Sequence, residues 1–170
     1  AKGLDFPKVT LVGVISADTA LNLPDFRSAE RTFNLLTQVA GRAGRSDLGG
    51  RVIIQSYTPQ HYAIQAAKTH DYNTFYDKEI SLRKELNLPP FCHMVTLTLR
   101  GRNEEKVFKA SESLKASIEK EDKSKNVEIL GPAPSPISKM KGMYRWGIFL
   151  RSESAENIIS ILKTALGKNR

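Results

Sequence analysis

Two consecutive prolines, Pro89 and Pro90, constrain the fold of this 170-residue chain more than any other feature. Proline fixes its own backbone dihedral and drives the preceding residue into an extended conformation, so residues 88–91 predict a stiff connector. Nearly continuous apolar runs and helical patterns precede the connector, and alternating strands follow it. We therefore expect three segments: residues 1–58, a helical linker over residues 59–91, and a C-terminal domain over residues 92–170.

The first segment predicts an α/β architecture. Residues 9–15 form a nearly continuous apolar run, typical of a strand that is covered on both faces in a parallel sheet. A helix is expected from about Ser28, a residue type favoured at helix N-caps, and residues 51–57 predict a second strand. Two parallel strands with one helix are too few for an independent sheet. We expect earlier strands in a preceding part of the protein, and an open strand edge through which two copies could associate.

The helix after Ser28 carries the candidate functional side chains. At about 100° per residue, Gln38, Arg42 and Arg45 point to one side, opposite an apolar face. Arginine stays charged and offers a planar fork of donors to phosphate oxygens, so this spacing suits a clamp for a polyphosphate. Arginines at the C-terminal end of a helix, with Gly44 as the cap, would equally serve to offset the helix dipole. Spacing alone leaves both interpretations open.

Residues 38–45, Gln-Val-Ala-Gly-Arg-Ala-Gly-Arg, resemble the sixth conserved motif of superfamily 2 helicases, and residues 1–7 resemble the fifth. The sequences at residues 9–14, 17–18 and 23–27 narrow the resemblance to the PriA family of replication restart helicases. This resemblance implies the C-terminal part of a RecA-like helicase lobe, a helical link, and a C-terminal DNA-binding domain.

The resemblance also implies roles for individual residues. Arg42 and Arg45 would reach across to ATP bound on the preceding lobe and act in catalysis, and Gln38 would help to sense the nucleotide. Gly3 and Asp5 would lie near the nucleotide as well.

Cofactors are expected only in the intact protein. The chain contains no Gly-rich phosphate loop and no Asp-Glu motif, so ATP with Mg²⁺ would not be bound by this chain alone. The cysteine-rich zinc segment of PriA-like proteins would precede this sequence, because Cys92 is its single cysteine. The histidines have no ligand-like neighbours at metal-binding spacing, so no metal site is expected here.

The C-terminal segment predicts an α+β domain. Its patterns follow the order β-α-β-β-α, which is a ferredoxin-like (split β-α-β) arrangement that lacks its last strand. The expected strands cover residues 94–100, 127–130 and 144–151, and the expected helices cover residues 104–121 and 155–166.

A basic stretch in this segment is the candidate DNA contact. Lys139, Lys141 and Arg145 are interleaved with Tyr144 and Trp146, a composition suited to neutralising phosphates and stacking bases. Strand alternation places Trp146 on a face that more often packs a core, so we assign Trp146 to the core. The three basic residues are expected at the DNA backbone, with ordinary surface charge as the alternative.

Lys2 would also lie near the DNA backbone, as the helicase resemblance implies. The net charge of +8 fits a polyanionic partner. No apolar run approaches the roughly 20 residues of a membrane span, and no secretory pattern opens the sequence. We therefore expect a cytoplasmic protein without a membrane partner, and the resemblance implies a bacterial, nucleoid-associated one.

The resemblance implies the C-terminal part of an ATP-dependent DNA helicase, an ATP hydrolase that recognises and remodels stalled replication forks and initiates primosome assembly. The implied partners are forked and single-stranded DNA, other primosome proteins and single-stranded-DNA-binding protein. This chain alone is expected to lack ATPase activity. The alternative is a stand-alone nucleic-acid-binding module, or a replisome protein-interaction module, without motor function.

Overall fold

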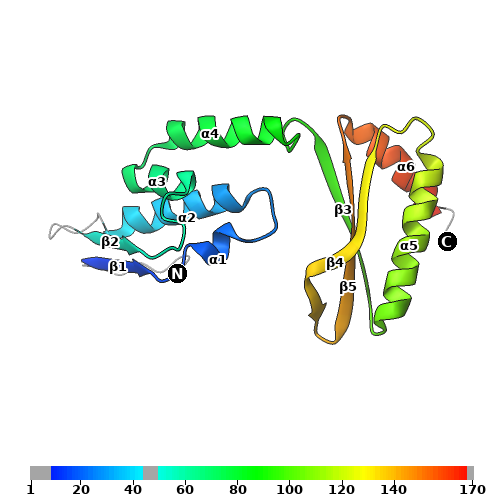
Figure 1. Cartoon of the computed structure of the whole chain (residues 1–170), viewed down its shortest axis with the longest axis horizontal. Helices are drawn as coiled ribbons and strands as arrows, with labels where there is room; N and C mark the ends of the chain where they lie inside the picture. Colours follow the sequence, from blue (N-terminus) through cyan, green and yellow to red (C-terminus); the bar gives the residue numbers. More distant parts are fainter. Residues whose placement is uncertain (1–8, 44–49, 168–170) are drawn as a thin grey trace. The chain divides into compact units, whose positions relative to one another are not determined.

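The structure is a computed structural model that describes residues 9–43 and 50–167 (Figure 1). The chain divides into two compact units, Ala1–Leu82 and Arg83–Arg170. This division differs from the three segments expected from the sequence, because most of the expected linker packs into the first unit. The mixed α/β character is as predicted, with a small parallel sheet in the first unit and an antiparallel sheet in the second.

The N-terminal unit contains one parallel strand pair, β1 (Leu11–Val14) with β2 (Arg51–Ile54). Helix α2 (Ser28–Ala43) connects the two strands and packs against both of them. A short helix, α1 (Asp18–Leu21), lies between β1 and α2. The strand, helix and strand that the sequence predicted are therefore present, although both strands are shorter than expected.

The core of this unit is formed mainly by α2 and the next helix, α3 (Tyr62–Thr69). Phe33 of α2 stacks on Phe75 of α4 (Tyr72–Glu85), with ring centroids 4.2 Å apart. Helices α3 and α4, which belong to the expected linker, are therefore fixed to the N-terminal unit by buried apolar contacts. That packing explains why the unit extends to Leu82.

Within the described part of the N-terminal unit, helices cover the β1–β2 sheet on one face only. On the other face, Leu11 is 58% exposed, Ile53 is 60% exposed, and Ile15, which follows β1, is 84% exposed. The apolar run at residues 9–15 was expected to be covered on both faces, so the structure differs from the prediction here. Three exposed aliphatic side chains on one sheet face are unusual for a surface that stays in water.

The C-terminal unit has the predicted element order β-α-β-β-α (Figure 1). Its three strands form an antiparallel sheet in the order β3-β5-β4. Its elements are β3 (His93–Gly101), α5 (Glu104–Glu121), β4 (Glu128–Met140), β5 (Met143–Ser152) and α6 (Ala155–Gly167).

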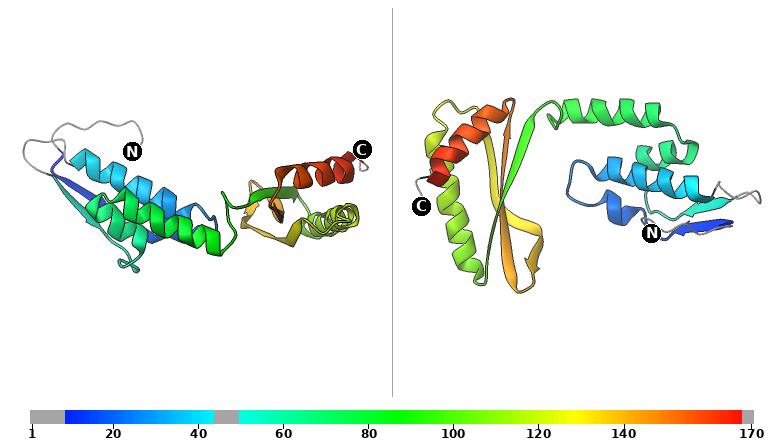
Figure 2. Two further views of the ribbon diagram at one scale, coloured as in Figure 1. Left: turned by 90° about the horizontal axis from the view of Figure 1, so that it is seen from above. Right: turned by 180° about the vertical axis from the view of Figure 1, so that it is seen from behind.

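Helices α5 and α6 lie on the same face of this sheet, and the views of the unit agree on this (Figure 2). The core between the layers contains Ile118 of α5, Ile148 and Leu150 of β5, and Ile158 of α6, all almost fully buried. Along β3, half-buried residues that pack on this core alternate with exposed ones. Among the described residues of the C-terminal unit, no helix covers the opposite face of the sheet.

Strand β4 is much longer than the predicted strand over residues 127–130. It continues through Pro132, Pro134 and Pro136 and pairs only with β5. Proline is tolerated at a sheet edge, where its missing N–H removes no ladder bond from a central strand. Register shifts between Leu130 and Ala133, and between Pro134 and Lys139, accommodate these residues.

The connector after α4, here residues 86–92, is held to the rest of the second unit by Arg151 of β5. Its Nη1 atom donates to the carbonyl oxygens of Leu86 (3.1 Å) and Asn87 (3.3 Å), and its Nε atom donates to Glu128 of β4 (2.7 Å). The Sγ atom of Cys92 also donates to the carbonyl oxygen of Asn87 (3.1 Å). These contacts place the connector in the C-terminal unit.

Candidate functional site

Helix α2 holds the one candidate nucleotide residue whose side chain the structure describes. Gln38 is exposed, whereas Thr32, Phe33 and Leu36 on the inner side of the helix are almost fully buried. The sequence prediction that Gln38 faces away from the apolar side of this helix is consistent with this placement. An amide anchored on a packed helix can donate and accept hydrogen bonds from a fixed position.

The other candidate nucleotide residues are only partly covered by the structure. The backbone of Arg42 belongs to α2, but its side chain lies outside the described part of the chain. Arg45, Gly3 and Asp5 lie outside the described residues, as does Lys2, the candidate DNA contact near the N-terminus. Their proposed roles therefore stay predictions.

Ser28 was expected to cap α2, and it acts differently. Its hydroxyl donates to the carbonyl oxygens of Leu23 and Asp25, each at 2.6 Å, so it ties the preceding loop to the start of the helix. A capping hydroxyl would instead accept a hydrogen bond from the first turn. Ser28 thus holds the first residue of α2 against the preceding loop.

Asp18 lies where β1 and β2 end, and its carboxylate is fully engaged. It accepts hydrogen bonds from the Ser56 hydroxyl (2.9 Å), the Thr58 hydroxyl (3.1 Å) and the Tyr57 backbone N–H (3.0 Å). Burial acts to raise the pKa of Asp18, but these hydrogen bonds outweigh it and the pKa is lowered. Asp18 therefore shapes the loop after β2 as a charged carboxylate.

The loop that Asp18 holds presents Tyr57, whose side chain is 93% exposed. Sequence reasoning did not single out this residue. The exposure of Tyr57 follows from tertiary contacts that the sequence does not show. The hydroxyl residues on both sides of Tyr57 bind a carboxylate about 40 positions earlier in the chain.

Metal-binding geometry is absent from the residues that the structure describes: no three His, Cys, Asp or Glu side chains cluster there. His61 has a structural role, because its Nδ1 atom accepts from the backbone N–H of Ala63 (3.2 Å) and caps α3. Among the described helices, none is long and apolar enough to cross a membrane.

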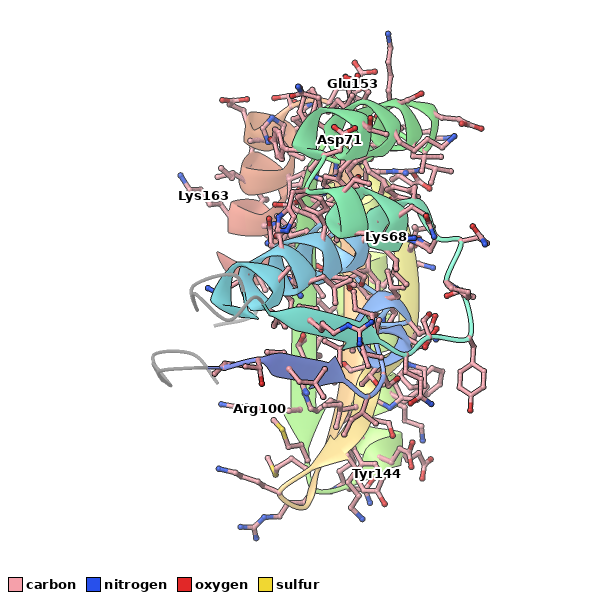
Figure 3. All side chains as sticks on the ribbon, turned by 90° about the vertical axis from the view of Figure 1, so that its left-hand side faces the viewer. Lys68, Asp71, Arg100, Tyr144, Glu153 and Lys163 are labelled. Carbon is pink, nitrogen blue, oxygen red and sulfur yellow. The ribbon has the colours of Figure 1, made fainter. Side chains whose placement is uncertain are left out.

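In the C-terminal unit, the candidate DNA residues come from the β4–β5 hairpin. Lys139 and Lys141 are exposed, and Arg145 is half-buried. The Nζ atom of Lys139 lies 4.5 Å from the centre of the Tyr144 ring and donates to its hydroxyl at 3.2 Å. In Figure 3, Tyr144 lies near the end of the sheet at which this hairpin turns.

Trp146 packs against the helix layer. Its ring lies 4.8 Å from that of Phe108 on α5, centre to centre, in a tilted arrangement. Trp146 is therefore part of the packed layer between sheet and helices, as the sequence predicted. Arg145, its neighbour in β5, points to the opposite, uncovered face.

Comparison with known proteins gives two findings. Residues 84–170 match the family model described as the primosomal protein N C-terminal domain. The chain is also similar to proteins named replication restart protein PriA. It is 48% identical over 166 residues to that of Bacillus subtilis, covering 98% of this chain and 20% of the relative. It is 47% identical over 158 residues to that of Synechocystis, covering 93% of this chain and 19% of the relative.

A more distant relative matches the whole chain. The replication restart protein PriA of Treponema pallidum is 38% identical over 170 residues, which cover 100% of this chain and 26% of the relative. The chain thus spans about a fifth to a quarter of the length of these relatives.

Proposed function

This chain belongs to the PriA family of primosomal proteins, and we propose that it forms the C-terminal part of a protein that acts in replication restart and primosome assembly. The similarity to relatives named for replication restart extends over both compact units. Because the chain spans only a fifth to a quarter of those relatives, the activity that follows is proposed for a longer parent protein.

We infer that the N-terminal unit is the end of a RecA-like lobe and that the C-terminal unit is a ferredoxin-like domain without its last strand. The parallel pairing of β1 with β2 through α2 supports the first inference. The strand order β3-β5-β4 supports the second. An earlier part of the lobe would cover the sheet face that exposes Leu11, Ile15 and Ile53.

The parent protein is proposed to be an ATP-dependent DNA helicase. Arg42 and Arg45 would stabilise the negative charge that develops on the transferred γ-phosphoryl group, and Gln38 would hydrogen-bond the nucleotide. Gly3 and Asp5 would lie beside the nucleotide. Mg²⁺ would be held chiefly by the rest of the parent protein, since this chain lacks the phosphate loop and the Asp-Glu motif.

The observation that carries this proposal is the orientation of α2. Its inner side is anchored by Phe33 and Leu36, while Gln38 is exposed on the outer side. A helix held in this way can present a row of polar side chains to a nucleotide bound on another lobe without collapsing onto its own core.

The zinc segment is proposed to lie in the preceding part of the parent.

The motor role is tested in the full-length parent protein with Arg42→Ala. DNA-stimulated ATP hydrolysis is expected to fall by about 10³-fold or more, the scale of an arginine finger, while DNA binding is retained. Arg31→Ala is the control, because Arg31 lies on the same helix and pairs with Asp25 (2.8 Å). Equal turnover in the two variants would contradict the proposal. The 170-residue chain itself should show only background ATPase activity.

DNA binding by the C-terminal unit is the second part of the proposal. Lys139, Lys141 and Arg145 would contact the backbone of forked or single-stranded DNA, and Lys2 would add a contact from the N-terminal unit. The alternative function, a stand-alone nucleic-acid-binding or protein-interaction module, is favoured by the position of Lys139, Lys141 and Arg145 in one compact unit. Anisotropy with labelled forked and single-stranded DNA at two salt concentrations tests both. Affinity that falls steeply with salt supports phosphate contacts, and no binding at low salt favours protein interaction.

Further partners are proposed for the parent protein on the strength of its family. These are other primosome proteins and single-stranded-DNA-binding protein, in a nucleoid-associated cytoplasmic setting. The outer edges of β1 and β2 are unpaired within the described residues, so self-association of this chain through a strand edge is also proposed.

A further inference from the structure

The face of the β3-β5-β4 sheet turned away from α5 and α6 has a defined composition. We call it the uncovered sheet face, and it includes Thr96, Thr98, Arg100, Leu130, Arg145, Gly147 and Phe149. Strand register brings these residues together, since Thr96 is opposite Phe149 and Leu130 is opposite Phe149 on the other side. In antiparallel sheets such directly opposed side chains are neighbours on one face.

The charged residues of the three strands are almost all basic. Glu128 is the only acidic residue in the three strands, and it is already paired with Arg151. Arg100 and Arg145 lie directly opposite each other across β3 and β5, and neither makes an ion pair within the described part of the chain. Like charges at directly opposed positions destabilise a sheet. In the helix layer, by contrast, α5 mixes acidic and basic residues along its length.

An aromatic ring lies near the middle of the same face. Phe149 is half-buried and follows Gly147 by two positions, so both are on the uncovered sheet face. A Cβ atom added at Gly147 would lie 3.5 Å from the Phe149 ring, so the bare glycine leaves room beside the ring. Leu130, 50% exposed, flanks the ring from β4, and Thr96 flanks it from β3.

We propose that the uncovered sheet face binds a single strand of nucleic acid, with phosphates at Arg100 and Arg145 and a base stacked on Phe149. This inference rests on the proposed DNA-binding function and assigns it to a surface beyond the hairpin lysines. Charge complementarity selects a polyanion, and the aromatic ring selects unpaired bases, because a base within a duplex has no free face to stack. Arg145 and Phe149 are four residues apart, about 13 Å along the strand, which suits a few nucleotides of extended chain.

The first test is an NMR titration of the 170-residue chain, labelled with nitrogen-15, against an eight-nucleotide oligo-dT at low salt. The amide signals of Thr96, Thr98 and Gly147 are expected to shift, and those of the outer side of α5 and α6 are expected to stay. Shifts confined to the hairpin at residues 139–141 would overturn this inference and leave the proposed DNA-binding function standing. No shift or binding with any DNA would overturn both.

The second test compares paired variants by fluorescence anisotropy. Arg100→Gln with Arg145→Gln is expected to weaken oligo-dT binding by about tenfold or more and to reduce the salt dependence, log Kd against log salt, by about 1.4. Lys120→Gln with Lys163→Gln removes the same charge from exposed positions on α5 and α6, and should leave the salt dependence nearly unchanged. Arg100 and Lys163 are both labelled in Figure 3, on the sheet and on α6 respectively. Equal effects of the two pairs would overturn the inference.

Phe149→Leu keeps apolar volume and removes the stacking surface. It is expected to weaken oligo-dT binding by about fivefold or more while the chain remains folded, as judged by circular dichroism. Tighter binding of a duplex of the same length, unaffected by this substitution, would overturn the single-strand assignment. If DNA binding bypasses this face altogether, its apolar residues would instead indicate a protein partner.

Discussion

Asp18 shows how one carboxylate can organise the end of a sheet. Its three hydrogen-bond donors all come from residues 56–58, so it joins the end of β1 to the loop after β2. Asp18 follows the strand expected over residues 9–15, at the carboxyl end where α/β proteins often carry functional groups. Sequence inspection could not reveal that this carboxylate is used internally, because its donors are distant in the chain and are fixed only when the two strands pair.

The pH dependence of this contact has a definite sign. The pKa of Asp18 is lowered in the folded chain, so its stabilising effect is present above the ordinary value of about 3.9 and is lost as the pH falls below it. A carbon-13 NMR titration should give a midpoint for Asp18 below about 3.9. Asp18→Asn should remove this part of the acid sensitivity of the N-terminal unit, whereas Asp77→Asn, at an exposed position on α4, should not. A midpoint above the ordinary value would contradict the prediction.

Elements were predictable wherever local signals agreed. Residues 104–121 were predicted as a helix and form α5, because Asn103 caps it and Val107 and Ile118 lie on one apolar face. Strand β4 was predicted as only residues 127–130, since proline reads locally as a break. Its continuation depends on pairing with one neighbour at a sheet edge, which is a tertiary property.

The cap of α5 can be tested directly. The side-chain oxygen of Asn103 accepts from the backbone N–H of Lys106 (2.9 Å), so Asn103→Ala leaves a first-turn donor without this partner. The free energy of unfolding of the C-terminal unit is expected to fall by about 1 kcal/mol. Thermal unfolding followed by Trp146 fluorescence measures this change, because Trp146 packs against Phe108 of α5. Asn103→Ser should retain most of the stability, and an equal loss in both variants would argue against a capping effect.

At the scale of the whole molecule, two units with separate cores share one chain. The proline connector predicted a division near residues 88–91, whereas the two units divide between Leu82 and Arg83. The sequence did not show on which side the expected linker would pack. Phe75 decides this, because it stacks on Phe33 of α2 and brings α4 into the first core. Of the candidate site, the sequence indicated the exposed side of α2 and the core position of Trp146. The uncovered sheet face was not predicted, since it depends on strand order and register.

Residues 83–170 are expected to fold alone. Their core contains no residue of the N-terminal unit, so a chain of residues 83–170 should unfold cooperatively. Its midpoint, read from Trp146 fluorescence, should lie within about 4 °C of the same transition in the whole chain, less than the shift that a 1 kcal/mol change causes. A non-cooperative transition would show that the C-terminal unit depends on the first.

Residues 1–82 are expected to behave differently, because they expose Leu11, Ile15 and Ile53 on one sheet face. Sedimentation velocity of this piece should show self-association that increases with concentration. Ile53→Lys should reduce it, and Lys68→Gln, at an exposed position on α3, should have little effect. A monomer at all concentrations would indicate that this face tolerates water.

The reactivity of the Cys92 thiol reports how often the connector opens. Its thiol is buried and donates to the carbonyl oxygen of Asn87, and burial raises the pKa of the thiol. Both effects suppress the thiolate, which is the form that alkylating reagents attack. Iodoacetamide would therefore modify the folded chain only when the connector opens locally and exposes Cys92. The labelling rate would then measure the frequency of this local opening. Loss of the Arg151 hydrogen bonds to Leu86 and Asn87 should make local opening of the connector more frequent.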